Sequence, residues 1–568
     1  MKTLASVLAL VAASAAAQNL TPSQKETDFR NLVATINTWY ALVDWKKQYL
    51  GVDALDLKTW LTRVSQTKTD LDFYELCTEY IYSLQDTHTY YELPSNFIAQ
   101  LGLGADLYDG VALIEGINRT TLRAADYPFA IGDELVSVDG VPAEELIERF
   151  KKYFPEGNDR AARRIAAARL GSRLQAYMPH ATDVGASASV VIRRQSGALE
   201  TYTIPWNKTG VPLEVGPVPS PTFTTSLPKE KSAAAANQKP RYLSDLEELQ
   251  HSGLDRRRTT LGVLNYGSRN PVFINGLGSG FTRRLGGASA DFFYSGVFRQ
   301  DGLNIGFIRI PSYSPSSQTT ALQQLDREIA FFQQNTDGLI VDGMRNPGGN
   351  LCFGEQVMRR FSPEPFWATG FALRAMYWRV MFYYQDMIDA KANGASPEVI
   401  QQWEQLYAAM ADANQKNRGV TEPIPICSST LRLEPAKDAS GNITAYTKPM
   451  MMLIDEFSTS TGDSVPSMFQ ESKRGLLYGY RSNGAGGNNT SVPVGPYSEG
   501  LIGVTMGVQV KRTPVSVEGY PTTGVIENVG VHPDIVNDYM TKDNLLQGGA
   551  PFVRQFLTEM VNYIRSKQ

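Results

Sequence analysis

Cysteine is scarce in this sequence of 568 residues, and two common metal-binding motifs are missing from it. The three cysteines, Cys77, Cys352 and Cys427, allow at most one internal disulfide, so a scaffold held together by several disulfides is excluded. Neither His-Glu-x-x-His nor Cys-x-x-Cys occurs, which disfavours a zinc site. We therefore expect no metal and no other cofactor.

An apolar run long enough for a membrane-spanning helix, about 18 residues, is also missing beyond the N-terminus. At the N-terminus, Lys2 precedes a shorter apolar run, Leu4–Ala13, which Ala15-Ala16-Ala17 follows. A charged start, a short apolar centre and a small-residue end are typical of a cleaved signal peptide, here residues 1–17. The sequence thus predicts a secreted protein with no membrane span, and the vacuole is the alternative destination.

Neither sign of charge dominates: 54 Lys and Arg stand against 58 Asp and Glu, and no basic patch stands out. This balance disfavours a nucleic-acid partner. Hydrophobic residues make up 42% of the chain, enough for sizeable buried cores, so wholesale disorder is excluded. Six Asn-x-Ser/Thr sequons fit a secreted glycoprotein, and the candidate glycosylation sites are Asn118, Asn207, Asn442 and Asn488.

The first half of the chain divides into three parts. Apolar residues at three- and four-residue spacing predict helices over residues 18–97, which carry Asp86-Thr87-His88-Thr89 near their end. His88, one of four histidines, is a candidate base, and a polar turn whose hydrogen bonds are satisfied is the alternative.

Residues 98–215 contain short strand patterns, and Ile131–Pro142 resembles the turn-strand-turn of PDZ domains. Whether this PDZ-like β-rich domain binds a peptide stays open. Residues 216–258 are rich in proline and serine and predict a flexible linker, with removal on activation left open.

Residues 259–568 predict an α/β core. Asn304–Ile310 and Gly338–Asp342 read as strands separated by a helix, which is a parallel crossover unit. A helical hairpin is expected as an insertion at residues 370–418. Met450–Ile454 is a third apolar run, typical of a strand buried on both faces.

Small polar residues follow that third strand, from Ser458 to Asp463, before an amphipathic helix pattern. A strand that turns into a helix presents a hydroxyl beside the free backbone N–H groups of the helix, a setting that suits an acyl-transfer nucleophile. An ordinary helix N-cap is the alternative. Gly348-Gly349 follows the strand at 338–342 and could bring backbone N–H groups close to a ligand, although a tight turn explains the pair equally.

Three motifs in this order resemble the tail-specific, or C-terminal processing, serine peptidase family: Asp342–Gly349, Asp455–Asp463 and Glu527–Asp534. The resemblance covers most of the chain and implies a ClpP/crotonase-like peptidase core with an N-terminal helical segment and a PDZ-like domain. The bacterial members pair the middle serine of S-x-S-x-S, here Ser460, with a downstream lysine. That lysine position falls at Ala485 here, so a Ser/Lys dyad is excluded.

Ser460-Thr461-Gly462-Asp463 instead resembles the branch that contains the chlamydial protease-like activity factor and tricorn core protease. This resemblance implies a base from an N-terminal Asp-x-His motif, here His88, and a late glutamate, here Glu527. Imidazole can accept the Ser460 proton at neutral pH, and Glu527 would orient it. The N–H groups of Gly348 or Gly349 and of Thr461 would form the oxyanion hole.

The sequence therefore predicts a secreted serine endopeptidase that acts on a protein or peptide substrate through a Ser-His-Glu triad. A non-catalytic protein that binds a small molecule or peptide on the same fold is the alternative. The sequence leaves the cleavage preference and a homodimer open.

Overall fold

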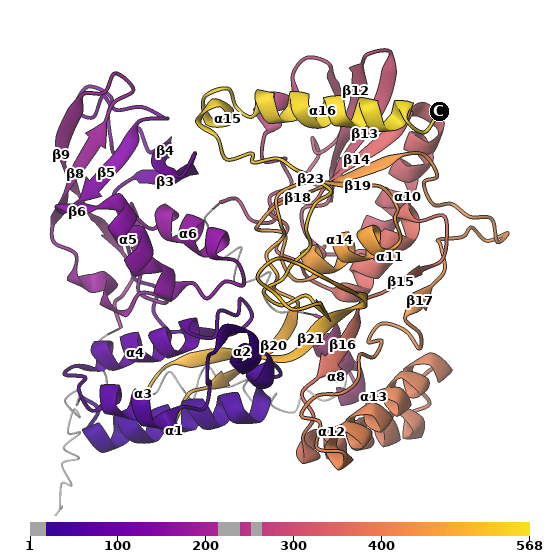
Figure 1. The fold of residues 1–568 in the computed structure, drawn as a ribbon, viewed down its shortest axis with the longest axis horizontal. Helices are drawn as coiled ribbons and strands as arrows, with labels where there is room; N and C mark the ends of the chain where they lie inside the picture. Colours follow the sequence, from indigo (N-terminus) through magenta and orange to yellow (C-terminus); the bar gives the residue numbers. More distant parts are fainter. Residues whose placement is uncertain (1–18, 214–238, 252–263) are drawn as a thin grey trace, which may run out of the picture.

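This computed structural model describes residues 19–213, 239–251 and 264–568. The predicted signal peptide and most of the predicted linker lie outside the described residues. The N-terminal helices, a β-rich domain, a large α/β core and a helical hairpin form separate regions of the molecule (Figure 1). The mixed α/β architecture confirms the predicted fold class.

Four helices form the N-terminal region: α1 (Pro22–Trp39), α2 (Val43–Leu50), α3 (Leu57–Val64) and α4 (Asp70–Tyr82). Thr21 and Thr69 cap α1 and α4 by accepting hydrogen bonds from backbone N–H groups of the first turn. Phe29, Leu32 and Ile36 recur on the buried face of α1. The chain then enters β1 (Tyr90–Glu92), which pairs with a strand of the core.

The β-rich domain is built on a six-stranded antiparallel sheet in the order β3-β4-β5-β8-β9, with β6 beside β5. Its strands are β3 (Leu103–Tyr108), β4 (Val111–Ile117), β5 (Glu134–Val138), β6 (Val141–Pro142), β8 (Ser187–Arg193) and β9 (Leu199–Pro205). Helices α5 (Ala143–Phe150) and α6 (Asp159–Ala168) belong to the same region. A three-stranded sheet of β2 (Ile98–Gln100), β7 (Ser172–Leu174) and β10 (Asn207–Thr209) completes it.

A seven-stranded sheet forms the centre of the core, in the order β11-β12-β13-β14-β18-β19-β23. The five strands β13, β14, β18, β19 and β23 run parallel to one another, whereas β12 pairs antiparallel with both β11 and β13. The strands are β11 (Phe281–Leu285), β12 (Tyr294–Gln300), β13 (Leu303–Arg309), β14 (Gly338–Asp342), β18 (Met450–Ile454), β19 (Leu476–Gly479) and β23 (Ile535–Val536). Every residue of β14 and β18 is buried, as the apolar runs predict.

Helices cover both faces of this sheet. Met450 and Met452 pack with α10 (Gln318–Asn335), α11 (Leu351–Phe361) and α14 (Thr461–Glu471). The alternate residues Met451 and Leu453 pack with α16 (Ala550–Arg565), which lies across the opposite face (Figure 1). This two-sided burial explains why strands at the centre of the sheet contain almost no polar residues.

A second sheet joins the N-terminal helices to the core. Its longest strand, β21 (Leu501–Val515), pairs antiparallel with four others: β1, β16 (Gly370–Leu373), β20 (Gly487–Pro493) and β22 (Thr523–Val525). The remaining short elements of the core are the 3-10 helix η3 (Ile274–Leu277), β15 (Phe366–Trp367), β17 (Arg432–Leu433) and α15 (Lys542–Leu546). Because β1 pairs with β21, the residues just before β1 are fixed against the core.

The helical hairpin and one helix of the predicted linker pack together. The hairpin consists of α12 (Tyr377–Ala392) and α13 (Pro397–Gln415). Residues 241–250 form α8 (Arg241–Gln250), so the prediction of a flexible linker over 216–258 is wrong for this part. Leu246 and Leu249 of α8 are buried in the same cluster as Trp403 of α13, and this packing stabilises a helix that the proline-rich surroundings do not suggest.

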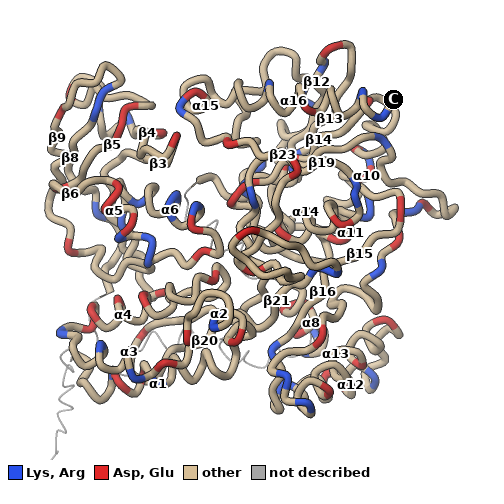
Figure 2. The backbone as a smooth tube through the Cα atoms, viewed as in Figure 1, with Lys and Arg blue, Asp and Glu red and all other residues tan. Residues whose placement is uncertain are grey.

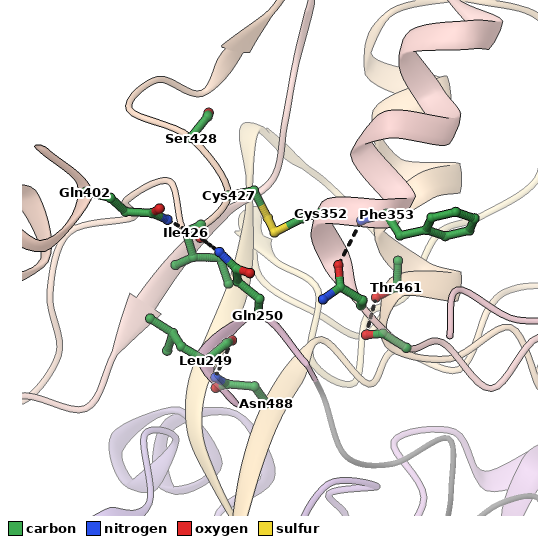
Figure 3. The surroundings of a disulfide bond; sticks show 12 residues. Leu249, Gln250, Cys352, Phe353, Gln402, Ile426, Cys427, Ser428, Thr461 and Asn488 are labelled. Carbon is green, nitrogen blue, oxygen red and sulfur yellow. Dashed lines mark hydrogen bonds between the residues drawn. A yellow bond between two sulfur atoms is a disulfide. The ribbon is translucent and has the colours of Figure 1, made fainter. Parts of the chain in front are cut away.

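Cys352 and Cys427 form a disulfide between the first turn of α11 and the segment that follows the hairpin (Figure 3). Next to it, the Ile426 carbonyl oxygen accepts hydrogen bonds from Gln250 of α8 and Gln402 of α13. The disulfide therefore connects the core to the point where α8 and the hairpin meet. Cys77 is buried and not part of a disulfide, which agrees with the expectation of at most one disulfide.

We expect the Cys352→Ala/Cys427→Ala double variant to lower the free energy of unfolding by about 4 kcal/mol, because the disulfide closes a long loop and restricts the unfolded chain. Urea denaturation of both proteins, with and without reductant, measures the difference. Reductant should bring the wild-type midpoint down to that of the double variant and leave the double variant unchanged. Equal midpoints without reductant would contradict the expectation.

Charged residues of both signs are spread over every region of the backbone (Figure 2). Among the described residues, no helix has both the length and the apolar composition required to cross a bilayer.

Candidate active site

Ser460 lies at the turn between the central strand β18 and helix α14. It is the N-cap residue of α14, and its φ of 62° and ψ of −115° place it in a region that residues with a side chain rarely adopt. Such backbone strain is typical of functional turns that fix one side chain in place. Ser460 is 1% exposed, and none of the described residues makes a hydrogen bond to its Oγ. The hydroxyl is therefore held at a helix N-terminus, where it can still form a hydrogen bond with a base or a substrate.

Asp463 holds this turn in its strained conformation. One of its carboxylate oxygens, Oδ2, accepts hydrogen bonds from the N–H groups of Ser460 (2.9 Å) and Ala485 (3.1 Å). The other, Oδ1, accepts from Gly484 N–H (2.9 Å) and from the Ser482 hydroxyl. Burial raises the pKa of Asp463 to about 6, and these donors oppose the rise. One carboxylate thus fastens the Ser460 turn to the segment 482–485.

The glycine-rich segment 484–487 touches the surroundings of all three predicted triad residues. The Ala485 carbonyl oxygen accepts a hydrogen bond from Ser460 N–H (3.1 Å). A Cβ atom on Gly487 would lie 3.2 Å from Cγ and Nδ1 of His88. The Gly484 carbonyl oxygen accepts from the N–H of Asn528, the residue after Glu527, at 2.7 Å. Segments that are far apart in the sequence therefore meet around four small residues.

His88 is fully buried in the segment between α4 and β1. Its backbone N–H donates to Asp86 Oδ1 (2.8 Å), and its backbone carbonyl oxygen accepts from Asn489 Nδ2 (2.8 Å). Asp86 Oδ2 accepts from the hydroxyls of Thr89 and Thr505, which binds the segment to β21. The Asp-Thr-His-Thr motif is thus a rigid, hydrogen-bonded turn, and it carries the imidazole beside Gly487.

Glu527 follows β22 and is also fully buried. Its Oε1 accepts a hydrogen bond from Lys46 Nζ (2.7 Å), whereas no described residue donates to Oε2. The pKa of Glu527 is raised to about 8, mainly by burial and then by the neighbouring Asp86 carboxylate, while Lys46 opposes the rise. One oxygen is thus held by an ammonium group, and the other can accept a proton donor such as an imidazole.

The loop after β14 lies against the Ser460 turn. A Cβ atom on Gly348 would lie 2.7 Å from Ser460 Cβ and 3.1 Å from Thr461 N, so only glycine fits there, and its φ of 90° also requires glycine. However, the Gly348 N–H donates to Asn346 Oδ1 (2.8 Å) inside the loop. Of the three predicted oxyanion-hole residues, Gly349 and Thr461 are therefore better placed than Gly348 to supply an N–H group.

Residues 239–251 cover the loop that follows β14. His251, which follows α8, forms an antiparallel β-bridge with Asn350, and its Nε2 lies 2.9 Å from Ser314 Oγ. Because Ser460 and His88 are buried as well, the site is closed in this structure. An extended substrate pairing with the same loop would need residues 239–251 to move.

The four candidate glycosylation sites differ in exposure. Asn118, Asn207 and Asn442 are exposed, as a glycan requires. Asn488 is 2% exposed and donates from Nδ2 to the Leu249 carbonyl oxygen at 3.1 Å, a contact visible in Figure 3. The sequence prediction is therefore corrected at Asn488, because its amide nitrogen is enclosed and already paired.

Two charged residues of the site were absent from the sequence prediction. Asp463 belongs to a motif quoted there, and its place three residues after Ser460 fits a capping box, which is a readable signal. No sequence pattern connects Lys46 with the site, because it lies in a short helix 481 positions from its partner Glu527. A fully buried lysine is also rare, so sequence reasoning places such a residue on the surface.

Comparison with known proteins identifies two domains in the chain. Residues 304–537 match the model of Peptidase family S41, and residues 99–213 match that of a PDZ domain. An uncharacterized protein of Chlamydia muridarum (strain MoPn / Nigg) is 24% identical over 584 residues, covering 92% of this chain and 90% of the relative.

The solved structures similar to this chain include mature CPAF. Its complex with lactacystin has a TM-score of 0.71 at 19% identity and covers 95% of this chain and 99% of the other. A second structure of mature CPAF has a TM-score of 0.69, also at 19% identity, and covers 95% and 98%. At this identity the likeness shows a shared fold.

Proposed function

Since this chain carries a peptidase family S41 domain and a PDZ domain and is a serine-type peptidase, we propose that it is an endopeptidase that uses a Ser-His-Glu triad. Ser460 is the nucleophile, His88 the general base, and Glu527 the residue that orients the imidazole. The Gly349 and Thr461 N–H groups bind the oxyanion.

The reaction follows from these roles. His88 takes the Ser460 proton as Oγ attacks the substrate carbonyl, then gives it to the leaving amine, and the acyl-enzyme is hydrolysed by water in the same way. The negative charge that develops on the carbonyl oxygen is stabilised by N–H groups at the start of α14, where the helix dipole also favours an anion. Glu527 stabilises the imidazolium that forms between the two proton transfers.

The single observation that carries this proposal is the segment 484–487. It accepts hydrogen bonds from Ser460 and from the residue after Glu527, and at Gly487 it lies so close to the His88 ring that little room is left for a side chain. It also occupies the position where the lysine of a Ser/Lys dyad would stand. Ala485 cannot accept a proton, so the base must come from elsewhere. His88 supplies an imidazole beside Gly487 of this segment.

We also propose that the protein is secreted. The disulfide Cys352–Cys427 supports an oxidising compartment, since disulfides rarely persist in the cytosol. This support is independent of the signal-peptide pattern at the N-terminus.

A fluorophosphonate probe tests the catalytic proposal, because it reacts only with an activated serine. We expect labelling of the wild type at Ser460 and none of Ser460→Ala. Because residues 239–251 cover the site, the full chain is compared with chain treated briefly with trypsin, and labelling should rise as this segment is released. Absence of labelling in both samples would contradict the triad and favour the non-catalytic alternative for this site.

A further inference from the structure

Glu527 is held by a residue from the opposite end of the chain. We propose that Lys46 is a positioning residue for the reaction: its ammonium group favours the charged form of Glu527 and fixes the carboxylate to the segment that carries His88. This inference rests on the proposed triad and adds a fourth residue to it. It gives helix α2 of the N-terminal region a role in positioning the catalytic groups.

The contacts of Lys46 point to this role. Its side chain is fully buried in α2, and Nζ donates three hydrogen bonds: to Glu527 Oε1 (2.7 Å), to Asn528 Oδ1 (2.7 Å) and to the Gln85 carbonyl oxygen (3.1 Å). An ammonium group has three donors, so all are used. Gln85 lies three residues before His88, so Lys46 joins the acid and the base segment directly.

Asn528 reinforces the same connection. Its Nδ2 donates to the Gln85 carbonyl oxygen (2.9 Å), and its Oδ1 also accepts from Trp45 Nε1 (3.4 Å). Asn528 adopts a left-handed backbone with a φ of 62°, which asparagine tolerates better than most residues. The residue next to Glu527 is thus bound to both helix α2 and the segment that carries His88.

The charges around Glu527 explain why a cation is needed. Besides His88, its proposed partner, the groups that act on its charge include Asp86 of the base segment, Asp463 of α14, Tyr40 at the end of α1 and Lys46. Two of the other groups are carboxyls, and the Tyr40 phenol is neutral because burial raises its pKa well above 10. Lys46 is the only cation among these groups. Without it, a buried carboxyl beside other carboxyls would bind a proton more strongly.

A protonated Glu527 could no longer stabilise the imidazolium of His88. Lys46 lowers the pKa of Glu527, which stands at about 8 with Lys46 present. Removal of Lys46 therefore raises this pKa, and the carboxyl group then ionises only at more alkaline pH. A variant without Lys46 should therefore lose the most activity at neutral pH and regain activity as the pH rises.

The test is the pH dependence of kcat/KM for Lys46→Met, with Lys47→Met as the control. Lys47 is the next residue, exposed and paired with Asp53 on the surface. We expect Lys46→Met to lose about 10- to 100-fold at pH 7, since each pKa unit changes the ionised fraction tenfold below the midpoint. The loss should shrink to within about threefold near pH 10, and Lys47→Met should match the wild type throughout.

The double variant Lys46→Met/Glu527→Gln makes the test independent of how well Lys46→Met folds, because a buried pair of neutral side chains avoids an unpaired charge. Glu527→Gln cannot ionise, so adding Lys46→Met to it should change kcat/KM by less than about threefold. A Lys46→Met profile parallel to that of the wild type, or a further loss in the double variant, overturns the proposal.

The two possible failures are distinguishable. If only the role of Lys46 is wrong, the probe still labels Ser460 and Glu527→Gln is still slow. If the triad itself is wrong, Ser460 is not labelled and Glu527→Gln is as active as the wild type, which overturns both proposals.

Discussion

Ser460→Ala should lose kcat by about a millionfold, and His88→Ala by at least about a thousandfold, because nucleophile and base act as one unit. Glu527→Gln should be slow but less so, since this residue orients the base and does not react. Steady-state hydrolysis of a protein substrate by chain released from its covering segment measures all three. The double variant Ser460→Ala/His88→Ala should be no slower than Ser460→Ala alone.

His180→Ala is the matched control for the base. This histidine is about one-third exposed and lies beside Asp72 and Asp183, away from segment 484–487. It should retain nearly full activity. If His88→Ala kept more than about a tenth of the wild-type kcat, His88 would not be the base, because general-base catalysis contributes at least about a hundredfold.

Asp463→Ala should abolish activity and destabilise the fold together. The substitution leaves the N–H groups of Gly484 and Ala485 and the Ser482 hydroxyl buried without their acceptor, at about 1 kcal/mol or more each, and Ser460 N–H keeps only the Ala485 carbonyl oxygen. The strained Ser460 turn would also relax, because Asp463 no longer holds it. We expect at least about a hundredfold loss in kcat/KM and about 3 kcal/mol in the free energy of unfolding.

Asp463→Asn separates the two effects. An amide keeps one acceptor oxygen and replaces the other with a donor, so it should lie between Ala and the wild type in stability. Asp438→Ala is the control, since this aspartate accepts N–H groups in an exposed turn. It should change stability by less than about 1 kcal/mol. If Asp463→Ala kept more than about a tenth of wild-type activity, the turn would not depend on this carboxylate.

The parts of the fold that could be predicted are those where a local pattern determines the structure. The apolar run Met450–Ile454 has no polar residue on either face, so a strand buried on both sides was the natural interpretation. Helix α8 escaped prediction for the opposite reason. Its few apolar residues pack on the distant hairpin, and the surrounding Pro- and Ser-rich sequence carries no hint of that partner.

The same division holds for the site. Ser460 and the glycines of the 343–349 loop stand directly after parallel strands, where polar residues meet at one edge of the sheet, so they could be predicted from position. His88 and Glu527 needed a family resemblance, because nothing local connects them. Lys46 needed the structure: only the tertiary fold shows that its ammonium group reaches Glu527.

The pairing of β1 with β21 has a consequence for the synthesis of the protein. His88 leaves the ribosome long before the strand that fixes it and the glutamate that orients it. At ordinary elongation rates the delay is between about 20 and 90 seconds. Throughout that time the growing chain has no Glu527 and no completed β21 to assemble the site. If the proposed triad is right, a nascent or prematurely terminated chain should be inert, and peptidase activity should begin only when translation is nearly finished.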